Sequence, residues 1–276
     1  MSKRLQVAGD DVGYDKRWNF SSRVRRPDGG GFHIAMIFMA NDYFSFKRFT
    51  VRQPRAAMKV GTDGVVLGAW FDVGGPDVRI LDVGTGTGLI ALMAAQRNPA
   101  ARIDAVEIDS SSCLDAQENF AASPWGDRLR LFGESFAAFC SRSEGGYDRI
   151  VSNPPYFVRS LRSPDDARTA ARHADSLPFE ELLGGVRGLL TPEGALSVIL
   201  PCDAALEFTL AALCVGLYRS RILYVRSVPG AEPKRVCMEF RFGERTETVA
   251  SLTLLGEDRT AGEEYRALAG DFYLRM

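Results

Sequence analysis

The tetrapeptide Asn153-Pro154-Pro155-Tyr156 is the most specific chemical signal in the sequence, and it directly follows the apolar run at residues 147–152. Two consecutive prolines fix φ at about −65° and remove two amide donors, which leaves the backbone carbonyls rigidly placed. The side-chain carbonyl of Asn153 and the backbone carbonyl of Pro154 can then both accept hydrogen bonds from one planar NH₂ group. Tyr156 offers a ring face on which a flat ligand can stack. The four residues are therefore catalytic candidates at a site for the amino group of a base or a glutamine amide, with a purely structural turn as the alternative.

Such a site would help an amino nitrogen to act as a nucleophile. The lone pair on N6 of an adenine is delocalised into the ring. Hydrogen bonds from its two N–H groups to Asn153 and Pro154 would localise electron density on the nitrogen as it attacks an electrophile. Proximity and electrostatic placement would then carry a direct displacement without a covalent enzyme intermediate. The base must be reached outside a duplex, either flipped out or in a single-stranded loop.

A second candidate site is the glycine-rich turn at residues 84–88, between a strand-like run at 78–83 and a helical stretch at 89–97. Its glycines let the backbone turn sharply and approach a ligand, although the G-x-G-x-G spacing differs from that of dinucleotide enzymes. About nineteen residues further on, the next strand-like run ends in Glu107-Ile108-Asp109. A carboxylate there can accept both ribose hydroxyls of an adenosine. The pattern predicts such a ligand, and a structural turn with a surface acid is the alternative.

These motifs lie in a regular alternation of strand-like and helical stretches. Strands are predicted at residues 78–83, 102–108, 129–132, 147–152 and 195–200, and helices at 89–97, 110–122, 135–141, 178–190 and 202–216. This order predicts βαβ units, a mostly parallel sheet and right-handed crossovers. Two final strand-like runs, 221–228 and 234–242, are joined by a segment rich in Pro and Gly, which predicts a terminal antiparallel hairpin.

The glycine turn and its acidic partner resemble those of the class I S-adenosylmethionine-dependent methyltransferases. The resemblance implies a Rossmann-like α/β fold with a mostly parallel seven-stranded sheet and helices on both faces. It also implies that Gly84, Gly86 and Gly88 line the loop beneath the cofactor and that Glu107 holds the ribose. Asp82 would orient the loop or reach the methionine end.

Further cofactor contacts follow from the same resemblance. The segment after the third strand touches the adenine in this family. The usual aspartate is absent here, which leaves Ser135 and Phe136 as candidates. Residues 59–64 form a polar turn with two glycines that can fold back over the pocket, with a structural cap on the sheet as the alternative. The candidates in this turn are Lys59, Thr62 and Asp63.

The tetrapeptide alone does not settle the substrate, because methyltransferases that act on release-factor glutamine carry it too. The stretch at residues 57–70 closely resembles that of the bacterial tRNA1(Val) adenine-37 N6-methyltransferases, and the resemblance covers about residues 41–276. It implies methyl transfer from S-adenosylmethionine to N6 of an adenine in a tRNA anticodon loop, with S-adenosylhomocysteine as the product. N5-methylation of a protein glutamine and a cofactor-binding RNA chaperone are the alternatives.

The composition is that of an ordinary soluble globular protein, with 276 residues, 46% of them hydrophobic and 25% charged. No stretch reaches the roughly 18 apolar residues of a membrane helix. The net charge of −1 gives no hint of a nucleic-acid partner, so an RNA-binding surface would be a local patch. Five scattered cysteines and two histidines offer no metal site or histidine triad, and they indicate a reducing cytoplasm. We expect a monomer.

Two basic segments flank the motifs and are candidates for such a patch. The first lies between Tyr43 and Lys59, and the second is the loop that follows Tyr156. In the first, basic residues alternate with the aromatic residues Tyr43, Phe44, Phe46 and Phe49. This mixture suits phosphate contacts and base stacking, whereas a solvated face over core aromatics is the alternative. The candidate RNA contacts in the two segments are Lys47, Arg48, Arg52, Arg55, Arg159 and Arg172.

Residues 1–38 differ from the rest of the chain. They contain three consecutive glycines and show no sustained periodicity. We interpret them as a disordered or artefactual N-terminal extension, with Met39 as a candidate start. Residues 39–276 are expected to form a single methyltransferase domain.

Overall fold

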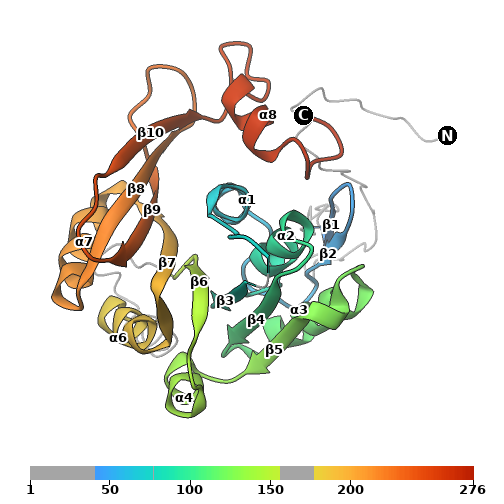
Figure 1. The fold of residues 1–276 in the computed structure, drawn as a ribbon. Helices are drawn as coiled ribbons and strands as arrows, with labels where there is room; N and C mark the ends of the chain where they lie inside the picture. Colours follow the sequence, from blue (N-terminus) through green and yellow to red (C-terminus); the bar gives the residue numbers. More distant parts are fainter. Residues whose placement is uncertain (1–40, 77, 156–176) are drawn as a thin grey trace, which may run out of the picture.

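The computed structural model describes residues 41–76, 78–155 and 177–276. Figure 1 shows a central sheet with helices on both faces. The strands of this sheet are β3 (Arg79–Val83), β4 (Arg102–Glu107), β5 (Leu129–Gly133), β6 (Tyr147–Ser152), β7 (Leu190–Pro201), β8 (Leu217–Arg226), β9 (Arg235–Phe242) and β10 (Thr248–Thr253). The helices are α1 (Thr62–Trp70), α2 (Leu89–Arg97), α3 (Ser110–Ala122), α4 (Phe136–Arg142), α6 (Phe179–Leu189), α7 (Ala205–Cys214) and α8 (Glu263–Ala269). A separate small sheet pairs β1 (Tyr43–Ser45) with β2 (Thr50–Arg52). The proposed extension, residues 1–38, lies outside the described residues.

Eight strands form the main sheet in the described part of the chain, in the order β10-β8-β9-β7-β6-β3-β4-β5. Seven of them correspond to the predicted runs, and β8 and β9 form the predicted antiparallel hairpin. The α/β prediction is confirmed, but the predicted count of seven strands is wrong, because β10 pairs in parallel with β8 at the outer edge. Four of the six β10 residues are exposed, so this strand lacks the apolar pattern that marks the others.

Helix α1 begins at Thr62, so the polar turn predicted at residues 59–64 is wrong in its second half. This helix was not predicted from the sequence, because it contains two glycines and two adjacent valines, all poor helix formers. Tertiary packing overrides that propensity. A Cβ on Gly68 would lie 2.7 Å from Sδ of Met93, so glycine is what allows α1 to approach α2 so closely.

Two apolar cores lie on opposite faces of the sheet. One is built from α1, α2, α8 and the small sheet, and it receives alternate strand residues such as Ile80 and Ile103. The other is built from α4, α6 and α7 and receives the intervening residues, such as Leu81 and Val106. Because successive strand side chains point to opposite faces, both cores fix the same strand register.

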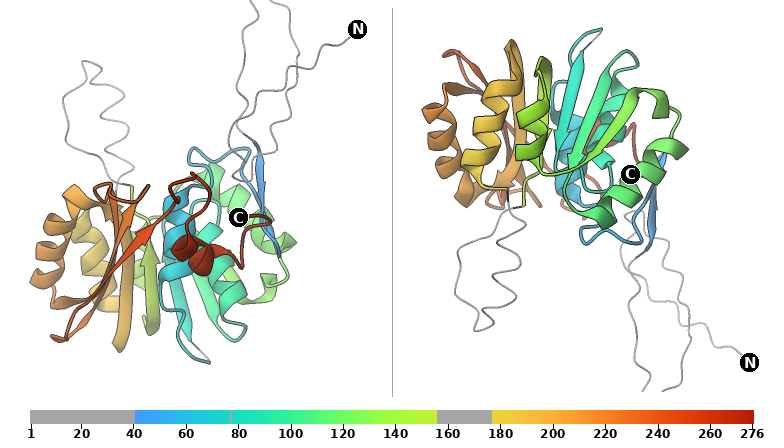
Figure 2. Two further views of the ribbon diagram at one scale, coloured as in Figure 1. Left: turned by 90° about the horizontal axis from the view of Figure 1, so that it is seen from above. Right: turned by 90° about the horizontal axis from the view of Figure 1, so that it is seen from below.

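The topological switch point of the sheet lies between β3 and β6. From β3 the chain moves outward through β4 to β5 and then returns to β6 on the other side of β3. Ligands of open α/β sheets bind at the carboxyl ends of the strands at such a point. The parallel register places Val83 opposite Ser152, so the glycine turn and Asn153 both begin there. In the left view of Figure 2 these carboxyl ends lie on the upper side of the sheet.

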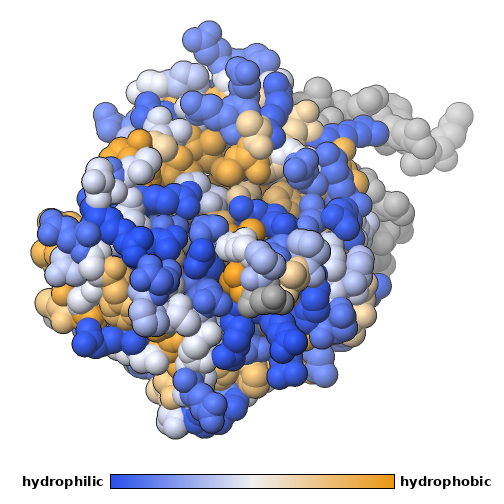
Figure 3. All heavy atoms as spheres, in the orientation of Figure 1, coloured by the Kyte–Doolittle hydropathy of each residue, from blue (hydrophilic) through white to orange (hydrophobic). Residues whose placement is uncertain are grey.

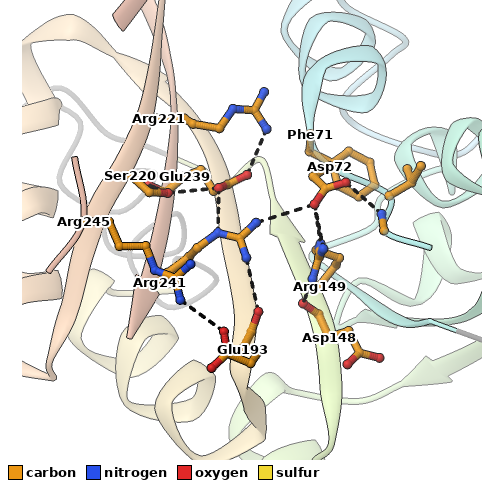
Figure 4. Close-up of polar contacts among 12 residues, drawn as sticks. Phe71, Asp72, Asp148, Arg149, Glu193, Ser220, Arg221, Glu239, Arg241 and Arg245 are labelled. Carbon is orange, nitrogen blue, oxygen red and sulfur yellow. Dashed lines mark hydrogen bonds and ion pairs between the residues drawn. The ribbon is translucent and has the colours of Figure 1, made fainter. Parts of the chain in front are cut away.

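A network of charged side chains crosses the sheet on the α1 face and ties β9 to its neighbours (Figure 4). Glu239 is 1% exposed and pairs with Arg221 at 3.0 Å and with Arg241 at 2.9 Å. A bulge in β8 lets Ser220 donate a further hydrogen bond to the same carboxylate at 2.9 Å. Asp72 continues the network by accepting hydrogen bonds from the Arg149 guanidinium. The buried Glu239 carboxylate therefore accepts hydrogen bonds from three side chains, those of Ser220, Arg221 and Arg241.

We predict that Glu239→Ala lowers the free energy of unfolding by about 2 kcal/mol or more, because it removes the buried carboxylate that accepts hydrogen bonds from Ser220, Arg221 and Arg241. Glu193→Ala is the control, since the Glu193 side chain is 87% exposed in its ion pair with Arg245. That variant should lose less than about 1 kcal/mol. Urea unfolding measures both, and equal losses would contradict the assignment.

Candidate active site

The glycine turn leaves β3 at Gly84 and enters α2 after Gly88. Gly84, Gly86 and Gly88 have φ angles of 70°, 56° and 84°, in the region that side chains with a Cβ rarely adopt. A Cβ on Gly88 would lie 2.5 Å from the Phe120 ring, so this glycine is needed for packing against α3. A Cβ on Gly84 or Gly86 would meet nothing within 4 Å. These two glycines therefore border open space in which a ligand can approach the backbone.

Glu107 ends β4 and holds the glycine turn in place. Its Oε2 accepts a hydrogen bond from the Gly86 amide at 2.8 Å, and its Oε1 accepts one from the Asp109 amide at 2.8 Å. The carboxylate is 9% exposed, and each of its oxygens keeps a further lone pair. A carboxylate fixed in this way beside Gly86 can accept hydrogen bonds from two neighbouring hydroxyl groups.

The two residues after Glu107 have different surroundings. The Asp109 carboxylate accepts the Ser112 amide at 2.7 Å and caps α3, and this hydrogen bonding to Ser112 lowers the pKa of Asp109. Ile108 is 56% exposed although it is apolar. Ile108 was not predicted from the sequence as a site residue, although an apolar residue between two acids at a strand end is a usable signal for a flat ligand.

Asp82 is fully buried beneath the glycine turn. Its Oδ2 accepts hydrogen bonds from the Thr85 hydroxyl at 2.6 Å and the Ala91 amide at 3.1 Å. Its Oδ1 is buried and has no hydrogen-bond partner among the described residues. Burial raises the pKa of Asp82 to about 7, against the opposing effect of these hydrogen bonds. The residue thus orients the turn and retains one acceptor that a bound donor would satisfy.

Asn153 follows β6 directly and lies beside the turn. The Ser152 hydroxyl donates to the Val83 carbonyl at 2.8 Å, which fastens the end of β6 to the end of β3. Asn153 is half-buried, and its side chain makes no hydrogen bond to another described residue. Pro154 is buried, whereas Pro155 is exposed. The amide of Asn153 is therefore available to a ligand, while Tyr156 lies outside the described residues.

The predicted contacts at residues 59–63 lie at the same edge, and two of the three have internal partners. The Lys59 ammonium donates to the Gln53 carbonyl. Thr62 is exposed at the start of α1. Asp63 forms an ion pair with Arg235 at 2.7 Å and so joins α1 to the first residue of β9. Their contact with the cofactor stays a prediction.

The predicted adenine contacts are also used by the fold. The Ser135 hydroxyl accepts the Ala138 amide at 3.2 Å and caps α4. Phe136 is 5% exposed, and a Cβ on Gly185 of α6 would lie 2.4 Å from its ring. Phe136 is thus a core residue between α4 and α6, and a role in contacting adenine stays a prediction for both residues.

The first basic segment offers less free surface than its sequence suggests. Three of its aromatic rings are buried, and the expectation that they stack on bases is wrong for Phe44, Phe46 and Phe49. Tyr43 remains 48% exposed. The rings pack together instead, with Phe46 and Phe49 stacked at 4.7 Å between centroids.

The basic side chains of this segment also differ in availability. Arg55 pairs with Asp115 and Glu118, both at 2.8 Å. The Lys47 ammonium donates to the Gly270 carbonyl at 2.7 Å, and Arg48 lies over the Trp125 ring. The remaining candidates are Arg52, which is exposed, and Arg159 and Arg172, which lie outside the described residues. Contact with RNA stays a prediction for all six.

None of the described helices is long and apolar enough to cross a membrane. Within the same residues, no three or more His, Cys, Asp or Glu side chains gather as metal ligands would. All five cysteines are free.

The fold is that of a class I methyltransferase. The model of the methyltransferase small domain family matches residues 67–202. A crystal structure of a predicted O-methyltransferase from Agrobacterium tumefaciens shares the fold, with a TM-score of 0.59 at 16% identity. The match covers 78% of this chain and 99% of that one.

Curated relatives define the family more narrowly. A protein of Phocaeicola vulgatus named tRNA1(Val) (adenine(37)-N6)-methyltransferase is 49% identical over 238 residues, which are 86% of this chain and all of that protein. One of the same name from Flavobacterium johnsoniae is 44% identical over 234 residues, 84% of this chain and all of that protein. The chain belongs to this family. Class I methyltransferases take the methyl group from S-adenosylmethionine, so the family implies this donor.

The pKa of Asp82 predicts a pH dependence of stability in the ligand-free protein. Because its folded-state pKa of about 7 exceeds the ordinary value of 3.8, the folded chain holds a proton between about pH 4 and pH 7 that the unfolded chain has lost. This group therefore makes the free energy of unfolding fall as pH rises through that window, by up to about 1.4 kcal/mol per pH unit. Asp82→Asn should remove this contribution. Urea unfolding at pH 4.5 and 7.5 measures it, and the exposed Asp127→Asn variant should keep the wild-type slope.

Proposed function

We propose that this protein transfers the methyl group of S-adenosylmethionine to N6 of adenine 37 in the anticodon loop of tRNA1(Val). The observation that supports this most strongly is the arrangement of Asn153 and Pro154 beside the glycine turn, fastened by the hydrogen bond from Ser152 to Val83. The names of the curated relatives supply the tRNA and the position of the base. We further propose that it acts in the cytoplasm, which suits its five free cysteines.

The residues of the site fit S-adenosylmethionine. Gly84 and Gly86 border open space, Glu107 presents a fixed carboxylate for the ribose hydroxyls, and Asp82 retains a buried acceptor. Exposed Ile108 offers an apolar face for the adenine ring. When bound, this cofactor supplies an electrophilic methyl group on a sulfonium.

Asn153 and Pro154 position the nucleophile. The Asn153 side-chain carbonyl and the Pro154 backbone carbonyl accept the two N–H groups of the target amine, which holds its lone pair toward the methyl donor. Proline at 154 and 155 keeps this backbone from adjusting, so little reorganisation is needed as charge develops on the nitrogen. Pro155 is exposed beside these two residues, and we infer that the target base enters on this side. A base extruded from the RNA loop fits this arrangement.

The experiment that tests this function offers labelled S-adenosylmethionine with either unmodified tRNA1(Val) or a purified release factor. We expect label in the tRNA alone, released on digestion as N6-methyladenosine. Substituting adenine 37 with guanine in the transcript should abolish incorporation. Label in a glutamine side chain of the release factor would favour the alternative substrate and contradict the proposal.

Two substitutions should separate cofactor binding from catalysis. Glu107→Ala should weaken S-adenosylmethionine binding at least tenfold, because it removes the ribose acceptor and releases the Gly86 amide. Asn153→Ala should leave that affinity nearly unchanged and lower kcat by about 10²-fold or more. Calorimetry and single-turnover kinetics measure the two effects. Glu118→Ala on α3 is the control for Glu107, and an equal loss of affinity there would argue against the ribose role.

A further inference from the structure

A cavity of about 880 Å³ lies at the opposite edge of the sheet, where β3, β4 and β5 begin. Its charged lining consists of Arg79, Arg102, Arg128, Arg130, Asp104 and Asp127. Four guanidinium groups thus face two carboxylates in a chain whose net charge is −1. The cavity is separate from the site formed by the glycine turn and Asn153, which lies at the carboxyl ends of the strands.

The strand register creates this concentration of positive charge. Arg79 and Arg102 are the first residues of β3 and β4 and lie directly opposite each other. Arg130 of β5 lies opposite Asp104 of β4, two residues along from Arg102 and on the same face. Like charges at opposed positions on neighbouring strands repel. An anion bound between them would relieve that repulsion.

Two of the four arginines already have internal partners. Arg79 donates to the Gly145 carbonyl at 2.8 Å and lies 3.7 Å from the Asp104 carboxylate. Arg128 donates to three backbone carbonyls at the end of α2 and the turn that follows it. Asp104 in turn accepts the hydroxyl of Tyr147 at 2.6 Å, so its negative charge is already hydrogen-bonded.

Arg102 and Arg130 differ from these two arginines. Both are exposed, and neither side chain makes a hydrogen bond or ion pair to another described residue. Their neighbours Arg79 and Arg128 are held by the fold and contribute fixed positive charge beside them. An arginine pair in this setting suits phosphate, because the planar guanidinium binds two phosphate oxygens at once.

We propose that this arginine cavity binds backbone phosphates of the tRNA substrate outside the anticodon loop. The inference rests on the proposed function and names a second contact region for the same substrate. Strand β5 is the edge of the sheet, and its five residues span about 16 Å from the cavity to the proposed active-site edge. An RNA whose loop enters at Asn153 can run along this edge strand to the cavity. Lys47 and Arg55 are engaged internally, so free cations at the cavity would add to the affinity for tRNA.

The test replaces Arg102 and Arg130 with glutamate together and measures the affinity for an unmodified tRNA1(Val) transcript over a series of salt concentrations. The control makes the same charge change at Arg259 and Arg275, which are exposed and lie far along the chain. We expect the cavity variant to bind about tenfold more weakly at low salt and to show a smaller salt dependence, by about one unit of slope per lost contact. The control should stay within twofold of wild type.

Equal affinities of the cavity variant and the control would overturn the proposal. The glutamine pair Arg102→Gln and Arg130→Gln provides a milder version, expected to lie between wild type and the glutamate pair, if the charge reversal impairs folding. Inorganic pyrophosphate tests whether the cavity binds a free phosphate compound instead of RNA. If it protects wild type from thermal unfolding while tRNA affinity is unchanged in the variants, the cavity takes a free phosphate and the RNA assignment is wrong.

Binding of tRNA is measured without a methyl donor, so its outcome does not depend on methyl transfer. Failure of that function appears as no methyl transfer from the wild-type protein to tRNA. Failure of the present inference appears as normal tRNA binding by the cavity variant while the wild-type protein still methylates tRNA.

Discussion

The parallel pairing of β3 with β6 is the constraint on which the rest of the site depends. It places Val83 opposite Ser152, and the Ser152 hydroxyl fastens the two strand ends together. The glycine turn and the Asn153 segment, separated by some seventy residues in the sequence, therefore begin side by side. Both cores and the buried Glu239 network hold this register, because a slip by one residue would move every strand side chain to the other face. The chemistry thus depends on the sheet more than on either loop.

The two edges of this sheet use charge differently. At the carboxyl edge, cations near the site are paired within the protein, as in Arg235 with Asp63 and Arg55 with Asp115. At the amino edge, Arg102 and Arg130 stay unpaired among the described residues. Figure 3 shows hydrophilic side chains over much of one face of the molecule, interrupted by hydrophobic areas. A near-zero net charge is therefore compatible with a polyanionic partner that meets small, separate groups of cations.

The sequence predicted the features that depend on local spacing. The strand, glycine turn and helix around Gly86 and the acid at Glu107 are encoded within a short stretch, and the structure brings them together. It did not predict β10 or α1, because an exposed edge strand lacks apolar alternation and α1 depends on the contact of Gly68 with Met93. The partners of individual side chains could not be predicted from the sequence either. Arg55 looks free in the sequence, but its partner Asp115 is sixty residues away and meets it only in the fold.

The central claim is that one sheet edge joins a methyl donor to an adenine amino group held by Asn153. Nucleoside mass spectrometry of tRNA1(Val) from a strain that lacks the gene tests it most directly, with the strain complemented by the wild-type gene or by Asn153→Ala. The account predicts that N6-methyladenosine is absent from the deletion strain, returns with the wild-type gene, and stays absent with the variant. Unchanged N6-methyladenosine in the deletion strain, or full restoration by Asn153→Ala, would contradict it.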